Sequence, residues 1–242
     1  MKRFLPAFAL AFGLLLGAQP AAQAEGTGLM SAHASVRDPA SLQRGAHLFF
    51  DYCAGCHSLK YLRYSRMADD LGLTEKQVMQ NLNFTGAKFQ EPAVSSMPAA
   101  DAKKWFGKDP PDLSLEVSAK GADWVYTYLN TFYLDPASPI GWNNTTLKNA
   151  AMPFPLWELQ GEQTAVMKPG THDVEKLQLT TPGSLTPAEY QQATRDLVNF
   201  LTYASEPAAM QRHHYGVWVI LFLALFTLLA YFLKKEYWKD VH

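Results

Sequence analysis

An uncharged run near the C-terminus constrains this chain most, because every side chain in it needs an apolar environment. Residues 217–233 read VWVILFLALFTLLAYFL, and aromatic residues that suit a membrane interface lie near both ends, at Trp218, Tyr231, Tyr237 and Trp238. At about 1.5 Å per residue this run makes a helix of about 26 Å, and its neighbours extend it to the thickness of a bilayer core. A buried core helix is the alternative, but uncharged runs of this length are typical of membrane spans. We therefore expect a transmembrane helix over residues 215–235.

The N-terminus carries the three parts of a secretory signal. Residues 1–24 begin with Lys2 and Arg3, continue through an apolar stretch, and end on small residues up to Ala24. A retained membrane helix is the alternative, but Pro6 interrupts an apolar run that is short for a bilayer span. We expect residues 1–24 to be a cleaved signal peptide.

Three lysines after the apolar run predict its orientation. Lys234, Lys235 and Lys239 follow it, and the cytoplasmic flanks of membrane spans are enriched in Lys and Arg. We therefore expect residues 236–242 to form a cytoplasmic tail and residues 25–214 to form a periplasmic domain. With 48% hydrophobic residues in the chain, that domain can bury a substantial core. A net charge of −1 and the lack of a basic stripe in the sequence give no indication of nucleic-acid binding.

Both cysteines of the chain lie in the short stretch YCAGCHS, residues 52–58. In an oxidising compartment Cys53 and Cys56 can form a disulfide, and a thioredoxin-like redox pair is a second alternative. That pair, however, expects a neighbouring βαβ pattern, which the sequence lacks. The order C-x-x-C-H accounts for all three residues, because it is the attachment motif of c-type haem. We expect one haem c, bound through thioether bonds to Cys53 and Cys56, with His57 as an axial ligand of the iron.

Helix signals surround this motif and predict a mainly α domain. Asp38 and Pro39 form an N-cap and first turn of a helix that runs into Cys53. Gly45 inside that helix costs about 1 kcal/mol relative to alanine, which indicates close approach by another helix, although simple tolerance is the alternative. A capping box at residues 186–189 begins a late helix with an apolar stripe. We expect this late helix to cross the helix of Gly45 and to close the domain.

The intervening chain is rich in proline and loops. Residues 74–81 and 122–132 show helical spacing of apolar residues, whereas residues 160–185 are a polar excursion with several turn signals.

A methionine is the expected sixth ligand if the iron transfers electrons without binding small ligands. Apart from Met1, the candidates are Met30, Met67, Met79, Met97, Met152, Met167 and Met210. Proline follows both Met97 and Met152, and proline fixes the local backbone of a loop that has to hold one sulfur in place. The ordinary role of any single methionine is packing, so the residues alone leave both candidates open.

Several motifs in order give the chain a family resemblance. The C-x-x-C-H motif is followed by Tyr61 and Tyr64, and then come PPDLS at residues 110–114, Met152-Pro153, and DLVNFL at residues 196–201 before the terminal span. WFG at residues 105–107 and GWNN at residues 141–144 add to the pattern. This series resembles the bacterial members of the cytochrome c1 family.

The resemblance implies a cytochrome c-like haem domain with loop insertions, mainly α, plus one C-terminal transmembrane helix. It also implies the haem subunit of the respiratory bc1 complex in the bacterial inner membrane, beside cytochrome b and in a dimeric assembly. Such a subunit accepts an electron from the Rieske iron-sulfur protein and passes it to a c-type cytochrome, without a catalytic acid, base or nucleophile of its own.

For the ligand set, the resemblance favours Met152 over Met97 as the axial methionine. Relatives often carry an arginine after PPDLS that can pair with a haem propionate, and Lys120 is the cation that follows PPDLS here. It is either a propionate partner or an ordinary solvated lysine. We expect Tyr61 and Tyr64 to pack near the porphyrin or to stabilise the fold, and packing is favoured because buried aromatic residues mostly belong to the core. A tethered haem sensor or peroxidase with an open sixth position, and a free-standing tethered electron shuttle, are the alternative functions.

Overall fold

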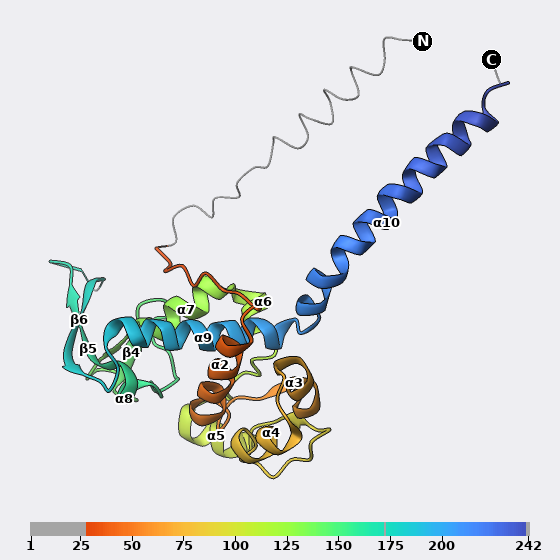
Figure 1. The fold of residues 1–242 in the computed structure, drawn as a ribbon. Helices are drawn as coiled ribbons and strands as arrows, with labels where there is room; N and C mark the ends of the chain where they lie inside the picture. The colour runs from red at the N-terminus through yellow and green to blue at the C-terminus, as the bar shows by residue number, and fades with distance from the viewer. Residues whose placement is uncertain (1–27, 172, 241–242) are drawn as a thin grey trace.

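The computed structural model describes residues 28–171 and 173–240, so the expected signal peptide lies outside the described residues. The chain forms a mainly α domain from which one long helix, α10, extends away (Figure 1). The helices are α2 (Pro39–Tyr52), α3 (Tyr64–Leu71), α4 (Glu75–Asn81), α5 (Ala99–Phe106), α6 (Glu116–Lys120), α7 (Ala122–Asn130), α8 (Trp157–Gln160), α9 (Pro187–Ser205) and α10 (Ala208–Tyr237). The strands are β1 (Leu59–Arg63), β2 (Pro92–Ala93), β3 (Phe132–Leu134), β4 (Trp142–Asn144), β5 (Gly161–Met167) and β6 (Val174–Pro182). The predicted fold class is therefore confirmed.

The crossing of α2 and α9 organises the domain. The carboxylate of Asp38 accepts a hydrogen bond from the Ala40 N–H at 3.0 Å, and Thr186 and Glu189 form a complete capping box at the start of α9. A β-carbon added at Gly45 would lie 2.0 Å from the carbonyl oxygen of Asp196 and 2.7 Å from the β-carbon of Phe200. Only glycine therefore permits the observed approach of the two helices. The close approach predicted from Gly45 is confirmed.

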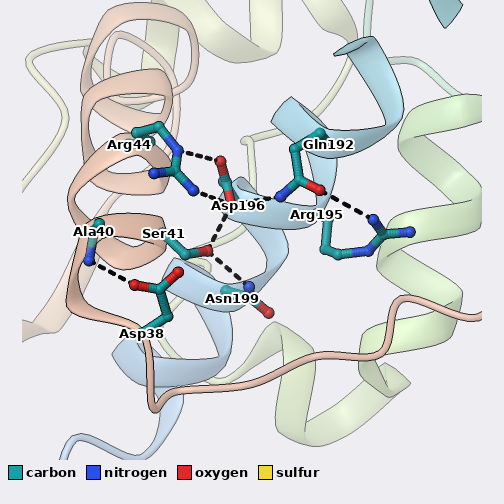
Figure 2. A network of polar contacts seen from close by, with 8 residues as sticks. All are labelled: Asp38, Ala40, Ser41, Arg44, Gln192, Arg195, Asp196 and Asn199. Carbon is teal, nitrogen blue, oxygen red and sulfur yellow. Dashed lines mark hydrogen bonds and ion pairs between the residues drawn. The ribbon is translucent and has the colours of Figure 1, made fainter. Parts of the chain in front are cut away.

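Polar side chains hold the same crossing from its edge (Figure 2). Asp196 is 2% exposed, and its carboxylate accepts hydrogen bonds from Ser41 Oγ at 2.6 Å and from Arg44 Nε at 2.6 Å. Asn199 Nδ2 donates to Ser41 Oγ at 2.9 Å, and Gln192 Nε2 donates to Asp196 at 3.0 Å. The buried charge is therefore paired and hydrogen-bonded, which is the condition under which burial of a carboxylate is tolerated.

The two tyrosines after the cysteine motif have different environments. Tyr64 is buried at the start of α3, and its ring centroid lies 5.7 Å from that of Phe50 in α2. Tyr61, by contrast, is 73% exposed. The prediction that both tyrosines pack in the core is therefore right for Tyr64 and wrong for Tyr61. The physical reason is that strand β1 does not keep the regular two-residue alternation, which would place Tyr61 on the same face as the buried Leu59. Its pairing with β2 is irregular between Leu59 and Arg63, and the buried residues are Leu59 and Leu62, so Tyr61 between them is left in solvent.

A small sheet with strand order β4-β3-β5-β6 lies at the far end of α9 from α10 (Figure 1). Strands β5 and β6 form an antiparallel hairpin over residues that the sequence had suggested to be a polar, turn-rich excursion. Leu177 and Leu179 alternate with polar residues in β6, but most side chains of this strand are exposed, so the alternation is too short to identify the strand in the sequence. The predicted helix over residues 122–132 is also shorter in the structure, because α7 ends at Asn130 and Phe132 begins β3.

Helix α10 contains the apolar run. Residues 215–237 of this helix form a candidate span of 23 residues, whose most apolar window has a mean hydropathy of 2.5 and is not buried inside the chain. The helix is long and apolar enough to cross a membrane. It begins directly after Pro207, and its first turn still contacts the domain through the buried Ala209 and the partly buried Met210. Within residues 28–171 and 173–240 the chain therefore has a helical domain with one candidate membrane anchor at its C-terminal side.

Candidate functional site

The two cysteines and the histidine lie on one turn at the end of α2. The Cys53 N–H donates to the Phe49 carbonyl at 2.8 Å, so the helix continues into the motif. The His57 N–H then donates to the Cys53 carbonyl at 2.8 Å, and the Cys56 N–H donates to the same carbonyl at 3.0 Å. Both cysteines are free thiols. This turn brings the side chains of Cys53, Cys56 and His57 to the wall of one cavity.

Five segments far apart in the sequence line that cavity, and most of the lining is apolar. The lining residues include Tyr52, Cys53, Cys56, His57, Lys108, Pro110, Pro111, Glu116, Trp124, Tyr128, Leu129, Ala151, Met152, Pro153, Leu197 and Leu201. The end of α2, the loop before α6, helix α7, the loop before α8 and helix α9 each contribute. The cavity therefore lies on the side of the α2–α9 pair that α7 covers.

The PPDLS segment holds His57 in position. Nδ1 of His57 lies 2.8 Å from the carbonyl oxygen of Pro111. A carbonyl only accepts hydrogen bonds, so Nδ1 carries the proton and Nε2 keeps its lone pair. Burial lowers the pKa of His57, against the hydrogen bond to Pro111 and the charges of Glu116 and Asp112. The imidazole is therefore neutral at pH 7, which is the form that binds metals.

Further hydrogen bonds fix PPDLS against the strand that follows the cysteine motif. The Leu113 N–H donates to the Ser58 carbonyl at 2.9 Å, and the Lys60 N–H donates to the carboxylate of Asp112 at 3.0 Å. Ser114 is fully buried, and its hydroxyl accepts from the Tyr61 N–H at 3.2 Å. The polar residues of this motif are thus used to hold the loop, and the loop holds the histidine.

Met152 lines the cavity from a second anchored loop, whereas Met97 is not part of the lining. The side chain of Asn144 is buried and accepts from the Thr146 N–H at 2.8 Å, while its Nδ2 donates to the Tyr128 carbonyl at 2.8 Å. Asn143 Oδ1 accepts from the Asn149 N–H at 2.8 Å. The structure therefore brings Met152 to the same cavity as the cysteines and His57.

The two asparagines of the GWNN segment are functional supports that residue-level reasoning missed. In the sequence they appear only as two adjacent asparagines, and asparagine pairs in turns and loops can have many roles. In the structure they order the loop that carries Met152, together with Phe154, whose buried ring stacks on Phe132 with centroids 4.7 Å apart.

Aromatic and charged side chains complete the wall. The rings of Trp124 and Tyr128 stack 5.2 Å apart at an angle of 8°. Burial raises the pKa of Tyr128 to about 12, and the negative charge of Glu116 adds to this effect. Burial also raises the pKa of Cys53 to about 12, so this thiol is protonated at neutral pH.

Lys120, the candidate partner of a haem propionate, lies outside the cavity lining. Its Nζ is 5.4 Å from the ring centroid of Trp124, in a cation–π contact, and Lys120 does not line the cavity. Lys108, two residues before PPDLS, lines the cavity instead. Sequence reasoning missed Lys108 because it considered only the cations that follow the motif.

The donor set of this cavity fits an iron porphyrin. A porphyrin is a large planar apolar group, so it needs apolar and aromatic walls, which the cavity supplies. Two thiols, a neutral imidazole and a thioether are the groups that attach and ligate haem in c-type proteins. In the part of the chain that the structure describes, no three His, Cys, Asp or Glu side chains gather to hold a bare metal ion. The geometry therefore favours a haem over a mononuclear metal centre.

Comparisons with known proteins agree with this geometry. The chain is 49% identical to cytochrome c1 of Allochromatium vinosum over 94% of its length and 96% of that protein. It is 44% identical to a protein named ammonia monooxygenase gamma subunit from Nitrosomonas europaea, over 85% of each chain. It is 30% identical to the mitochondrial cytochrome c1 of Schizosaccharomyces pombe, over 84% of its length and 68% of that protein. Residues 30–241 match the model of the cytochrome c1 family, and the chain belongs to this family.

Proposed function

We propose that this chain carries one covalently bound haem and passes electrons from a Rieske iron-sulfur protein to a c-type cytochrome. Membership of the cytochrome c1 family makes it a haem electron-transfer subunit of the bc1 complex. The observation that supports the finer proposal is the cavity in which Cys53, Cys56, His57 and Met152 meet.

Cys53 and Cys56 attach the porphyrin in this proposal. Each thiol would add across one vinyl C=C of the porphyrin. The addition forms a C–S bond at one vinyl carbon and a C–H bond at the other, and no group is released. Two covalent bonds at the end of α2 fix the haem to the turn that also carries His57. When bound, the haem supplies a one-electron couple, and the protein sets its potential through ligation, burial and hydrogen bonding.

His57 and Met152 ligate the iron in this proposal, His57 through Nε2 and Met152 through its thioether sulfur. The hydrogen bond from His57 Nδ1 to Pro111 fixes the tautomer and the ring orientation, as partners of metal-bound histidines usually do. A methionine thioether raises the reduction potential and closes the position at which small molecules would bind. A closed sixth position suits electron transfer and argues against the sensor and peroxidase alternatives.

Met152→Ala tests the ligand set, with Met97→Ala as the matched control. We expect the reduced haem of Met152→Ala to bind carbon monoxide and its reduction potential to fall, because the strong sulfur ligand is removed. Met97→Ala should exclude carbon monoxide like the unaltered chain, since Met97 lies outside the cavity lining. Unchanged ligand exclusion in Met152→Ala would reject Met152 as the axial ligand.

Gentle solubilisation of the membrane tests the partners. We expect the haem protein to co-purify with cytochrome b and a Rieske protein as a dimeric complex that reduces a c-type cytochrome. Purification as a single subunit would favour the free-standing shuttle. Purification with monooxygenase subunits would instead indicate a role like the one that the name of the N. europaea relative states.

We also propose that the haem domain, residues 25–214, lies in the periplasm after removal of residues 1–24. The basic residues Lys234 and Lys235 in the last turn of α10 support this orientation. Green fluorescent protein folds into a fluorescent form in the cytoplasm, so a fusion at the C-terminus should fluoresce in intact cells. A dark, full-length fusion would contradict the orientation.

A further inference from the structure

A carboxylate without a partner lies at the wall of the haem cavity. Glu116 is the first residue of α6, is half-buried, and lines the cavity together with His57 and Tyr128. Within residues 28–171 and 173–240 its side chain makes no hydrogen bond and no ion pair. Lys120 follows four residues later and lies over the ring of Trp124 instead. A half-buried charge against apolar walls is unfavourable unless it interacts with something, so its position calls for an explanation.

The chain before Glu116 is fixed on the His57 side of the cavity. The Pro111 carbonyl accepts the hydrogen bond of His57, and the Leu113 N–H donates to the Ser58 carbonyl. The Glu116 N–H donates to the Leu113 carbonyl at 3.3 Å, and the side chain of Val117 is buried. The first turn of α6 is therefore held at a fixed position relative to the imidazole.

The charge of Glu116 acts on groups around the cavity. It raises the pKa of Tyr128, although burial is the larger effect. The other two charged lining residues, Lys108 and Asp109, have charges of opposite sign. The carboxylate of Asp109 also lies 3.9 Å from Lys103 Nζ. Among the described residues, neither Lys108 nor Asp109 forms an ion pair with Glu116, so no direct partner neutralises its charge.

We propose that the carboxylate of Glu116 lowers the reduction potential of the haem iron that His57 and Met152 hold. This inference rests on the proposed function. Ferric haem carries one more positive charge than ferrous haem, and a fixed negative charge nearby stabilises the ferric form more. Partial burial makes the interaction stronger than it would be between exposed groups, because water and salt screen it less. Glu116 thus acts against the thioether of Met152 and sets the potential between the values that either would give alone.

Glu116→Gln in the full-length, haem-loaded protein tests the proposal, because it removes the charge and keeps the shape. We expect redox titration to give a more positive midpoint potential for Glu116→Gln. Glu75→Gln is the matched control, since Glu75 also begins a helix, is exposed, and lies outside the cavity lining, so its potential should equal that of the unaltered chain.

A second pair of variants separates charge from packing. Glu116→Asp keeps the charge and should stay close to the unaltered potential, whereas Glu116→Asn should shift to a more positive potential. This pair also gives the answer if Glu116→Gln loads haem poorly. Equal potentials for the charged and neutral variants, or a negative shift on neutralisation, would overturn the proposal. Loss of haem from all variants and from the unaltered chain, seen in the absorption spectrum, would instead reject the proposed function.

Discussion

The close approach of α2 and α9 at Gly45 predicts a measurable effect of one added methyl group. In Gly45→Ala the new β-carbon would lie 2.0 Å from the Asp196 carbonyl oxygen, 2.7 Å from its carbonyl carbon and 2.7 Å from the β-carbon of Phe200. Two of these atoms are backbone and the third is the first atom of a side chain, so no flexible group can move aside. Helix α9 has to shift away from α2, and the buried carboxylate of Asp196 shifts with it.

Two effects of opposite sign set the magnitude. Alanine favours a helix over glycine by about 0.5–1 kcal/mol, which would stabilise the variant. Overpacking costs about 1–3 kcal/mol, and we expect the upper end here because backbone atoms take the clash. The net expectation is a loss of about 2 kcal/mol in the free energy of unfolding. For a domain of this size that loss lowers the melting temperature by roughly 4–8 °C.

Urea unfolding of the detergent-solubilised full chain, followed by circular dichroism, measures this loss. Gly216→Ala is the matched control, because Gly216 is also helical but nothing lies within 4 Å of an added β-carbon. We expect no loss of domain stability in Gly216→Ala. A Gly45→Ala variant as stable as the unaltered chain, or more stable, would refute the packing argument, since helix propensity would then be the larger effect.

Three further predictions concern α9 and its contacts. Tyr190 is buried, which raises its pKa well above 10, so folding stability should be complete below about pH 10 and fall as pH rises further. In Tyr190→Phe, urea titrations between about pH 8 and 11 should show a shallower fall of the unfolding free energy with pH. The variant should also lose about 1 kcal/mol at neutral pH, because the hydrogen bond to the Leu129 carbonyl is missing. An equally steep fall would contradict the assignment. Asp196→Asn should cost about 1–3 kcal/mol, because it breaks a buried pair with the half-exposed Arg44, and a double-mutant cycle with Arg44→Met that shows no coupling would be inconsistent with the pair. Thr186→Ala removes the N-cap of α9 and should lower the unfolding free energy by about 1 kcal/mol, and an unchanged urea midpoint would refute that role.

Local signals predicted the helical frame well. Asp38-Pro39 and the capping box at Thr186 define helix starts through hydrogen bonds within a few residues, so they can be recognised without the fold. Gly45 predicted a long-range contact, because a glycine that lowers helix propensity needs a compensating reason. These short-range rules were sufficient to place α2 and α9 together.

The sequence was less informative where contacts between distant segments determine the local structure. In strand β6 only Leu177 and Leu179 alternate with polar residues, so its pairing with β5 left a periodic pattern too short to recognise. Tyr61 looked like a core residue by type, but the irregular pairing of β1 with β2 leaves its side chain in solvent. The choice between Met97 and Met152 could not be made from the proline that follows each of them.

The charged residues of the cavity lining could not be predicted from the sequence either. Lys108 and Glu116 reach the cavity because loops fold back over His57, and distance along the sequence from the cysteine motif does not indicate this. The hydrogen bonds of PPDLS were likewise visible only in three dimensions, although the motif itself was part of the family resemblance.

The mass of the denatured mature chain tests the central claim most directly. Denaturation removes every non-covalent cofactor, so any haem that remains is covalently bound. Intact-mass spectrometry should give the mass of residues 25–242 plus one haem, and the double variant Cys53→Ala, Cys56→Ala should lose that added mass. A mature chain with the mass of the polypeptide alone would contradict the account.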